Sequence, residues 1–169
     1  MRYFITFACY GSHVRGDGSG SVDRKHNIPG SRRLRADPGR AAGERSRMDQ
    51  APYVLDLSRR ASVLEAIAEV CKHRAWGLLA AHIRSTHAHV VVDAEVRPEK
   101  VMSDLKSYAS RRLSGLGVDG PDRRRWARHG STLWLKSDED VRTAIRYVVD
   151  GQGEPMAVFV ADGFWLWGR

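Results

Sequence analysis

The chain alternates apolar segments with polar connections that contain glycine, and this pattern predicts four strands and three helices. β-Branched and aromatic residues gather in four segments that are typical of strands. These segments are residues 2–12, 76–84, 87–96 and 132–136. Apolar residues at helical spacing predict amphipathic helices over 58–74, 98–116 and from Ser137 to the glycines at 151 and 153. Ser137 and Asp140 have the spacing of a capping box.

The order of these elements predicts the fold class. The order strand, helix, strand, strand, helix, strand suits a ferredoxin-like or RRM-like α/β sandwich of the α+β class. We expect one domain over residues 1–169, an antiparallel sheet with helices on one face, and an opposite face free for binding. A long basic insertion rich in glycine and proline follows the first strand at 13–52. The aromatic tail at 155–169 predicts a last strand or hairpin.

Composition narrows the classes of function. The 169 residues carry a formal net charge of +8, which favours an anionic partner, nucleic acid before membrane. No apolar run approaches the length of a transmembrane helix, and the first residues resemble a strand more than a signal peptide. The two cysteines, Cys9 and Cys71, are too few for a disulfide framework or a cysteine zinc site. We therefore expect a cytoplasmic protein that contacts nucleic acid.

Two histidines separated by one residue are the first candidate for chemistry. His87 and His89 would point to the same face of a strand, where two imidazoles can chelate one divalent cation. The alternative is a pair of exposed strand histidines. Tyr108 falls near the edge of the buried face of the following helix, and Arg112 lies close to its centre. An arginine there needs an anionic partner, whereas Tyr108 could simply anchor the helix.

Basic residues cluster in and after the second helix, and a tryptophan lies among them. Arginine contacts to phosphates and base stacking on tryptophan are usual ways to hold single strands. The predicted DNA-binding residues are Lys106, Arg111, Arg112, Arg123, Arg124, Arg125, Trp126 and Arg128, together with Arg24 and Lys25 of the insertion. The alternative is a solvated basic loop with Trp126 packed on the core.

Several segments together resemble a known family, the single-tyrosine HUH transposases. The segment 86–92, THAHVVV, resembles their His-hydrophobic-His signature, and 105–108, LKSY, resembles the helix that carries their nucleophile. The segment 3–7 is similar to their first strand. Residues 18–24 and 151–157 resemble parts of the REP-associated tyrosine transposases. The resemblance extends over residues 2–160.

This resemblance implies a metal-dependent endonuclease and strand transferase acting on single-stranded or hairpin DNA. His87 and His89 would hold Mg²⁺ or Mn²⁺, and Tyr108 would form a 5′-phosphotyrosine and release a 3′-hydroxyl. The family often has Gln or Asn one turn after the tyrosine to complete the metal site, a place held here by Arg112. A third ligand would then be Asp104, His82, water or substrate phosphate. One tyrosine per chain suits a monomer or a homodimer.

Two other functions, from classes different from the transposases, also fit the sequence. The first is a nucleic-acid-binding module without catalytic activity, whose metal site is degenerate at Arg112. The second is a metallonuclease in which the histidine pair activates water and Tyr108 is structural.

Overall fold

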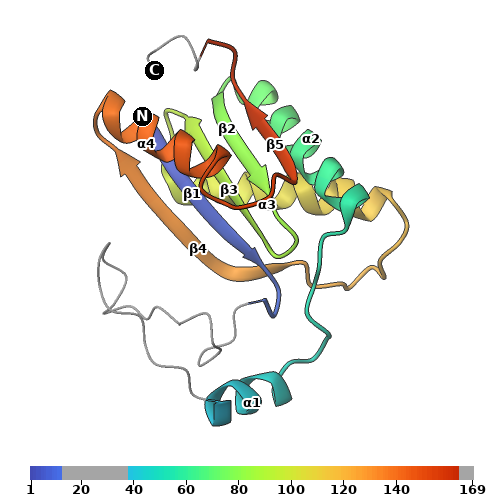
Figure 1. Ribbon diagram of the computed structural model, residues 1–169. Coiled ribbons are helices and arrows are strands. Elements are labelled where there is room, and N and C mark those ends of the chain that lie inside the picture. The colour runs from blue at the N-terminus through green and yellow to red at the C-terminus, as the bar shows by residue number, and fades with distance from the viewer. Residues whose placement is uncertain (13–37, 164–169) are drawn as a thin grey trace.

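The computed structural model describes residues 1–12 and 38–163, and its centre is one antiparallel sheet in the order β4-β1-β3-β2-β5 (Figure 1). This confirms the predicted α+β sandwich, and the order β4-β1-β3-β2 is the ferredoxin-like one. The strands are β1 (Arg2–Cys9), β2 (Gly77–Ile83), β3 (His87–Asp93), β4 (Trp126–Leu135) and β5 (Ala157–Val160). The helices within the described ranges are α1 (Pro38–Ser46), α2 (Leu57–His73), α3 (Pro98–Gly115) and α4 (Asp138–Val149). None of these helices is long and apolar enough to cross a membrane.

Most predicted elements are present with shifted ends. α2 begins after Asp56, whose carboxylate accepts a hydrogen bond from the Arg59 backbone N–H. The predicted capping box at Ser137 and Asp140 is present at the start of α4. Of the predicted insertion, residues 38–46 form α1, whereas residues 13–37, with Arg24 and Lys25, lie outside the described residues. The aromatic tail contributes β5, and residues 164–169 also lie outside the described part.

Strand β4 is longer than predicted, because it begins at Trp126 and not at Thr132. Its first half has a polar sequence with little strand signal, yet it pairs with β1. Gly130 lies opposite Phe7, and a Cβ there would lie 2.5 Å from both the Thr6 carbonyl oxygen and the Met102 sulfur. The missing side chain therefore lets β4 approach β1 and α3 closely at this point.

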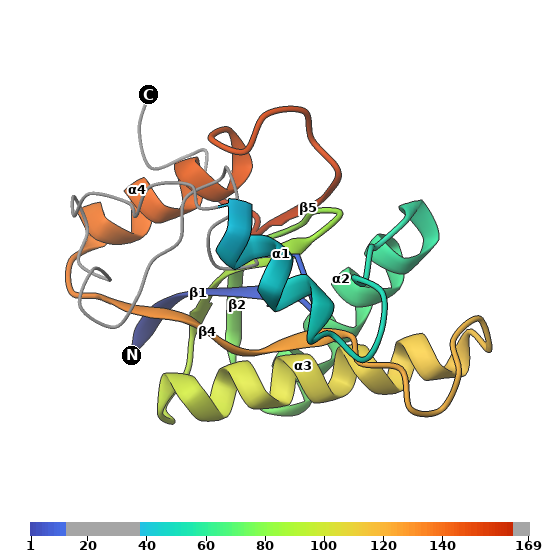
Figure 2. The same ribbon diagram turned by 90° about the horizontal axis from the view of Figure 1, so that it is seen from below.

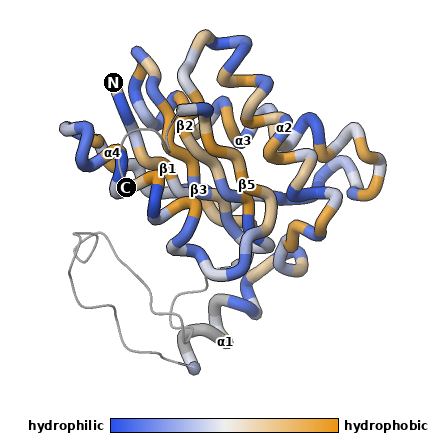
Figure 3. Tube along the Cα trace, turned by 45° about the horizontal axis from the view of Figure 1, so that its top comes forward, coloured by the Kyte–Doolittle hydropathy of each residue, from blue (hydrophilic) through white to orange (hydrophobic). Residues whose placement is uncertain are grey.

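The helices cover both faces of the sheet, which corrects the prediction that they share one face (Figure 2). α2 and α3 bury their apolar residues in a large core with alternate residues of β1 and β3. α4 forms a second, smaller core on the opposite face. Figure 3 shows hydrophobic residues along the strands of the sheet. The face expected to be free for binding is therefore partly covered by α4.

The alternation of side chains in β3 decides what its histidines face. Ala88, Val90 and Val92 point into the large core beneath α2 and α3, whereas Val91 packs in the small core beneath α4. His87 and His89 share the parity of Val91, so they project from the face that α4 covers. The register aligns His89 with Thr6 of β1 and with His82 of β2.

Candidate active site

The two histidines of β3 lie side by side, as the sequence predicted. Their ring centroids are 4.8 Å apart, and His89 is only 6% exposed. Burial and the neighbouring His87 lower the pKa of His89 to about 3. The ring is therefore neutral at physiological pH, the form in which imidazole binds a metal ion.

Two residues of β1 orient the His89 ring. The hydroxyl of Thr6 lies 2.8 Å from Nδ1, and the ring of Phe4 stacks on the imidazole at 5.7 Å between centroids. When Nδ1–H donates to the Thr6 hydroxyl, Nε2 carries the lone pair. Such a hydrogen bond on the second nitrogen is typical of metal-ligating histidines.

A tyrosine that the sequence analysis did not single out lies beside this pair. Tyr147, on α4, places its ring 5.7 Å from that of His89 and 5.9 Å from that of Phe4. Its side chain is 48% exposed, so a large substrate can reach the phenol. Val148, the next residue, is fully buried and fixes this end of α4 to the sheet. The histidine pair and an accessible phenol therefore meet on one face.

An amide side chain completes the group. Gln152 follows α4, donates to the Tyr147 carbonyl oxygen at 3.3 Å, and raises the pKa of His89, against the larger effect of burial. Gly151 lies between them. A Cβ at Gly151 would be 2.8 Å from the Tyr147 carbonyl oxygen, so only glycine fits without displacement. The sequence contained a signal for this group: a glutamine shortly after a tyrosine at the end of an amphipathic helix.

Tyr108 lies elsewhere. It packs against the large core on α3, with its ring 6.1 Å from that of His73 and 4.2 Å from the guanidinium carbon of Arg111. The sheet separates α3 from the face that carries His87 and His89. This contradicts the predicted role of Tyr108 as the nucleophile at the histidine pair. Arg112, on the same helix, pairs with Glu65 and Glu69 of α2 and fastens the two helices together.

The two predicted third ligands are engaged by other groups, which corrects that expectation. His82 uses both ring nitrogens, since Nδ1 lies 2.9 Å from the Val148 carbonyl oxygen and Nε2 accepts the Met156 N–H at 3.1 Å. Asp104 lies on α3 and pairs with Lys100 and Arg74. Within residues 1–12 and 38–163, no group of three His, Cys, Asp or Glu side chains could hold a metal ion. Oxygen from Gln152, water or substrate would have to complete a site at the histidine pair.

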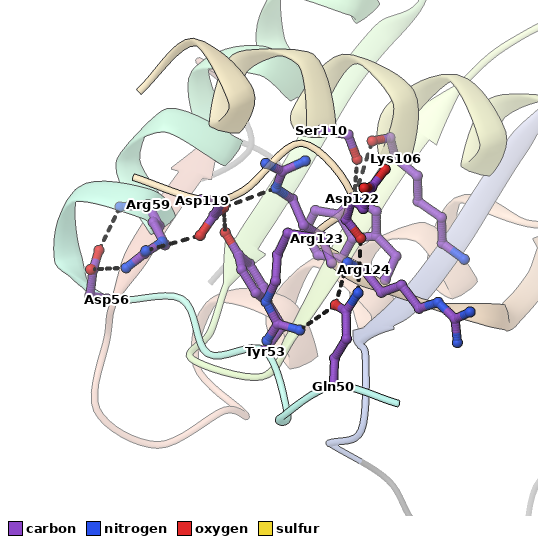
Figure 4. Close-up of polar contacts among 12 residues, drawn as sticks. Gln50, Tyr53, Asp56, Arg59, Lys106, Ser110, Asp119, Asp122, Arg123 and Arg124 are labelled. Carbon is purple, nitrogen blue, oxygen red and sulfur yellow. Dashed lines mark hydrogen bonds and ion pairs between the residues drawn. The ribbon is translucent and has the colours of Figure 1, made fainter. Parts of the chain in front are cut away.

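Much of the predicted DNA-binding surface has structural partners within the chain (Figure 4). Arg123 donates to Gln50 and to the backbone carbonyls of Ala51 and Pro52, and buried Arg125 pairs with Asp119 at 3.0 Å. These bonds tie the connection before β4 to the segment before α2. Arg124 pairs with Asp49 at the surface.

Trp126 and Lys106 also pack internally. The indole N–H of Trp126 donates to the Ser110 hydroxyl at 2.9 Å, and its ring packs edge-on against Phe7. The Lys106 ammonium donates to the carbonyl oxygens of Ala127 and His129. These contacts favour the reading of Trp126 as a residue packed on the core. Arg111 and Arg128 are exposed.

Comparison with known proteins assigns the chain to a family. One solved structure, a REP-associated tyrosine transposase bound to a REP hairpin, is 10% identical over 88% of this chain, with a TM-score of 0.49. The chain covers 64% of that protein, less than two thirds of its length. A candidate transposase from Deinococcus radiodurans is 14% identical over 90% of each chain, with a TM-score of 0.47. No curated protein sequence matches. The family described as IS200-like transposases matches residues 52–137, just over half of the chain and including the histidine pair, and the protein belongs to this family.

Proposed function

We propose that the protein is a single-strand DNA endonuclease and strand transferase that uses Tyr147, in place of Tyr108, as its nucleophile. The observation that carries the proposal is the ring of Tyr147 at 5.7 Å from that of His89, on the face shared with His87. A phenol that is half exposed beside two imidazoles and an amide matches the residue types that the family resemblance implied.

The donor set fits a divalent metal ion. His87, His89 and the amide oxygen of Gln152 would hold Mg²⁺ or Mn²⁺, with water or a DNA phosphate as further ligands. The neutral state of His89 supports this, because a ligating imidazole must be deprotonated. When bound, the ion supplies Lewis-acid activation of the scissile phosphate.

The covalent step is a transesterification. The Tyr147 phenolic oxygen, after losing its proton to solvent, bonds to the phosphorus of a DNA phosphodiester, and the bond from phosphorus to the 3′ oxygen breaks. The leaving oxygen takes up a proton and becomes a 3′-hydroxyl, while the 5′ side stays on the protein as a phosphotyrosine. A 3′-hydroxyl of another strand can reverse the step and release Tyr147. No nucleotide cofactor is needed, because the number of phosphodiester bonds is conserved.

The substrate class follows from charge and access. The net charge of +8 favours nucleic acid, and exposed Arg128 extends from β4, an edge strand of the sheet. An unpaired or hairpin-flanking strand can bring its phosphate to Tyr147 without opening a duplex.

Covalent capture tests the proposal. The protein is incubated with Mn²⁺ and labelled single-stranded hairpins with randomised flanks, and an adduct that survives SDS is sought. We expect Tyr147→Phe and the double variant His87→Ala, His89→Ala to lose the adduct. Tyr108→Phe is the matched control and keeps it, because Tyr108 lies on the other face of the sheet.

Each other outcome has a defined meaning. An adduct that is lost in Tyr108→Phe and kept in Tyr147→Phe refutes the assignment of the nucleophile. Cleavage without an adduct, unchanged in Tyr147→Phe, identifies a metallonuclease that activates water. Salt-sensitive retention of the hairpins without cleavage by the wild-type protein identifies a binding module.

A further inference from the structure

A buried histidine connects the sheet to both ends of the segment that carries Gln152. His82 lies in β2, is fully buried, and uses both ring nitrogens for backbone groups. Nδ1–H donates to the carbonyl oxygen of Val148, and Nε2 accepts the backbone N–H of Met156. Since Nε2 must accept, this pair of bonds requires the neutral ring with its proton on Nδ1.

The two backbone groups that His82 holds enclose one side of the candidate active site. Val148 directly follows Tyr147, and Met156 directly precedes β5. Between them lies Gln152, whose amide donates to the Tyr147 carbonyl oxygen and acts on the pKa of His89. A single ring therefore holds both ends of the segment that carries Gln152 and that directly follows Tyr147.

The surrounding contacts leave His82 as the internal support of this loop. Arg84, which directly follows β2, donates to the carbonyl oxygen of Glu154 from the exposed side. The backbone N–H groups of Asp150 and Gly151 bond only to the preceding turn of α4, at Arg146 and Tyr147. Among the described residues, His82 is the buried side chain that bonds to both ends of the loop.

We propose that His82 is a positioning residue that holds Tyr147 and Gln152 in register with His87 and His89. The inference rests on the proposed function, because positioning by His82 matters for the reaction only when Tyr147 is the nucleophile. His82 touches neither metal nor DNA in this role. It acts through the backbone of residues 148 and 156.

Variants that keep one of the two bonds separate positioning from simple packing. His82→Asn keeps a donor near the Nδ1 position, His82→Gln brings a carbonyl oxygen toward the Nε2 position, and His82→Leu removes both. A displacement of about 1 Å at a reacting group can cost about 100-fold in rate. We expect adduct formation in a single turnover to slow about 100-fold in His82→Leu and to recover in part in one or both amide variants. The affinity for hairpin DNA stays unchanged.

His73→Leu is the matched control, because His73 is an exposed histidine of α2 on the other face of the sheet. It keeps the wild-type rate. The proposal is refuted when His82→Leu, assayed below its melting temperature, forms adduct within threefold of wild type. A rate that falls only in proportion to the unfolded fraction also refutes it.

Amide hydrogen exchange tests the proposal independently of activity. We expect His82→Leu, or His82→Asn should the leucine variant not fold, to lose protection at Met156 and in residues 149–155. Protection in α2 and α3 stays unchanged. If the His82 variant loses protection but the wild-type protein forms no adduct, His82 does hold residues 148 and 156, and the proposed function is wrong. Unchanged protection at Met156 in the variant refutes the proposal that His82 holds this segment.

Discussion

A buried carboxylate in the connection before β4 offers the sharpest test of how the structure is stabilised. Asp119 accepts hydrogen bonds from the Tyr53 hydroxyl at 2.6 Å, from Arg125 at 3.0 Å and from Arg59 at 3.2 Å (Figure 4). The side chains of Asp119 and Arg125 are each 6% exposed. Burial alone would raise the pKa of Asp119, but the hydrogen bonds from Tyr53 and Arg125 outweigh it and lower the pKa.

Replacing Asp119 with asparagine removes the charge and leaves the Arg125 guanidinium buried without its counterion. Breaking a buried pair in this way costs about 3–5 kcal/mol. The matched control is Glu139→Gln, which breaks the exposed pair with Arg142 and costs less than about 1 kcal/mol. The change in the free energy of unfolding is measured by urea denaturation at pH 7, with similar m-values expected for all variants.

The reasoning also predicts a partial rescue. The double variant Asp119→Leu, Arg125→Met removes both charges, so it is expected to be more stable than Asp119→Asn alone. The reasoning is refuted if Asp119→Asn and Glu139→Gln unfold at the same urea concentration. Loss of the Asp119 charge would then not leave a costly unpaired charge on Arg125.

Three further predictions concern the candidate active site. Gly151→Ala forces a Cβ against the Tyr147 backbone, so we expect a loss of about 1–3 kcal/mol and slower adduct formation, whereas Gly115→Ala, with no atom within 4 Å of the new Cβ, is neutral in thermal melts. Thr6→Val removes the hydroxyl beside His89 Nδ1 and is expected to weaken Mn²⁺ binding about 10- to 100-fold in calorimetric titration; unchanged affinity contradicts a role in orienting the ring. Without metal, the pKa of His89 is 6.5 in the unfolded state and about 3 in the folded state, so the unfolded state binds the proton first as pH falls. The stability that neutral His89 contributes is therefore complete above pH 6.5 and is lost as pH falls toward 3. Urea midpoints at pH 7 and pH 5 check this, and His89→Gln is expected to reduce the difference between them.

The sequence predicted the elements well because their signals are local. Helical spacing, β-branched runs and the Ser137 capping box all depend on neighbours within a few residues. The pairing of His87 and His89 on one face followed from the same kind of rule. The polar first half of β4 was missed, since its pairing depends on the glycine at 130 and on β1, a segment far away in the sequence.

The sequence analysis placed Tyr108 at the histidine pair because local rules do not say which helix covers which face of the sheet. Tyr108 lies at the edge of the apolar stripe of its helix and is closer to the histidines in sequence, whereas Tyr147 lies on the exposed flank of α4. Only the tertiary arrangement puts α4, and not α3, above His89. The arginines at 123–125 were predicted to bind DNA for a related reason. Arg123 and Arg125 bond instead to Gln50 and Asp119, and a run of positive charge in the sequence does not reveal such contacts.

The strand order has a mechanical consequence for Tyr147. α4 follows β4 and precedes β5, which occupy opposite edges of the sheet, so the helix spans the sheet with an attachment at each border (Figure 1). The two attachments differ in strength, because β4 has ten residues along β1 and β5 only four along β2. We expect local opening to begin at β5, so that the end of α4 nearest Tyr147 swings outward while the rest of the sheet stays paired. Under the proposed function, a DNA end bound to Tyr147 would then move with a small part of the protein, without global unfolding.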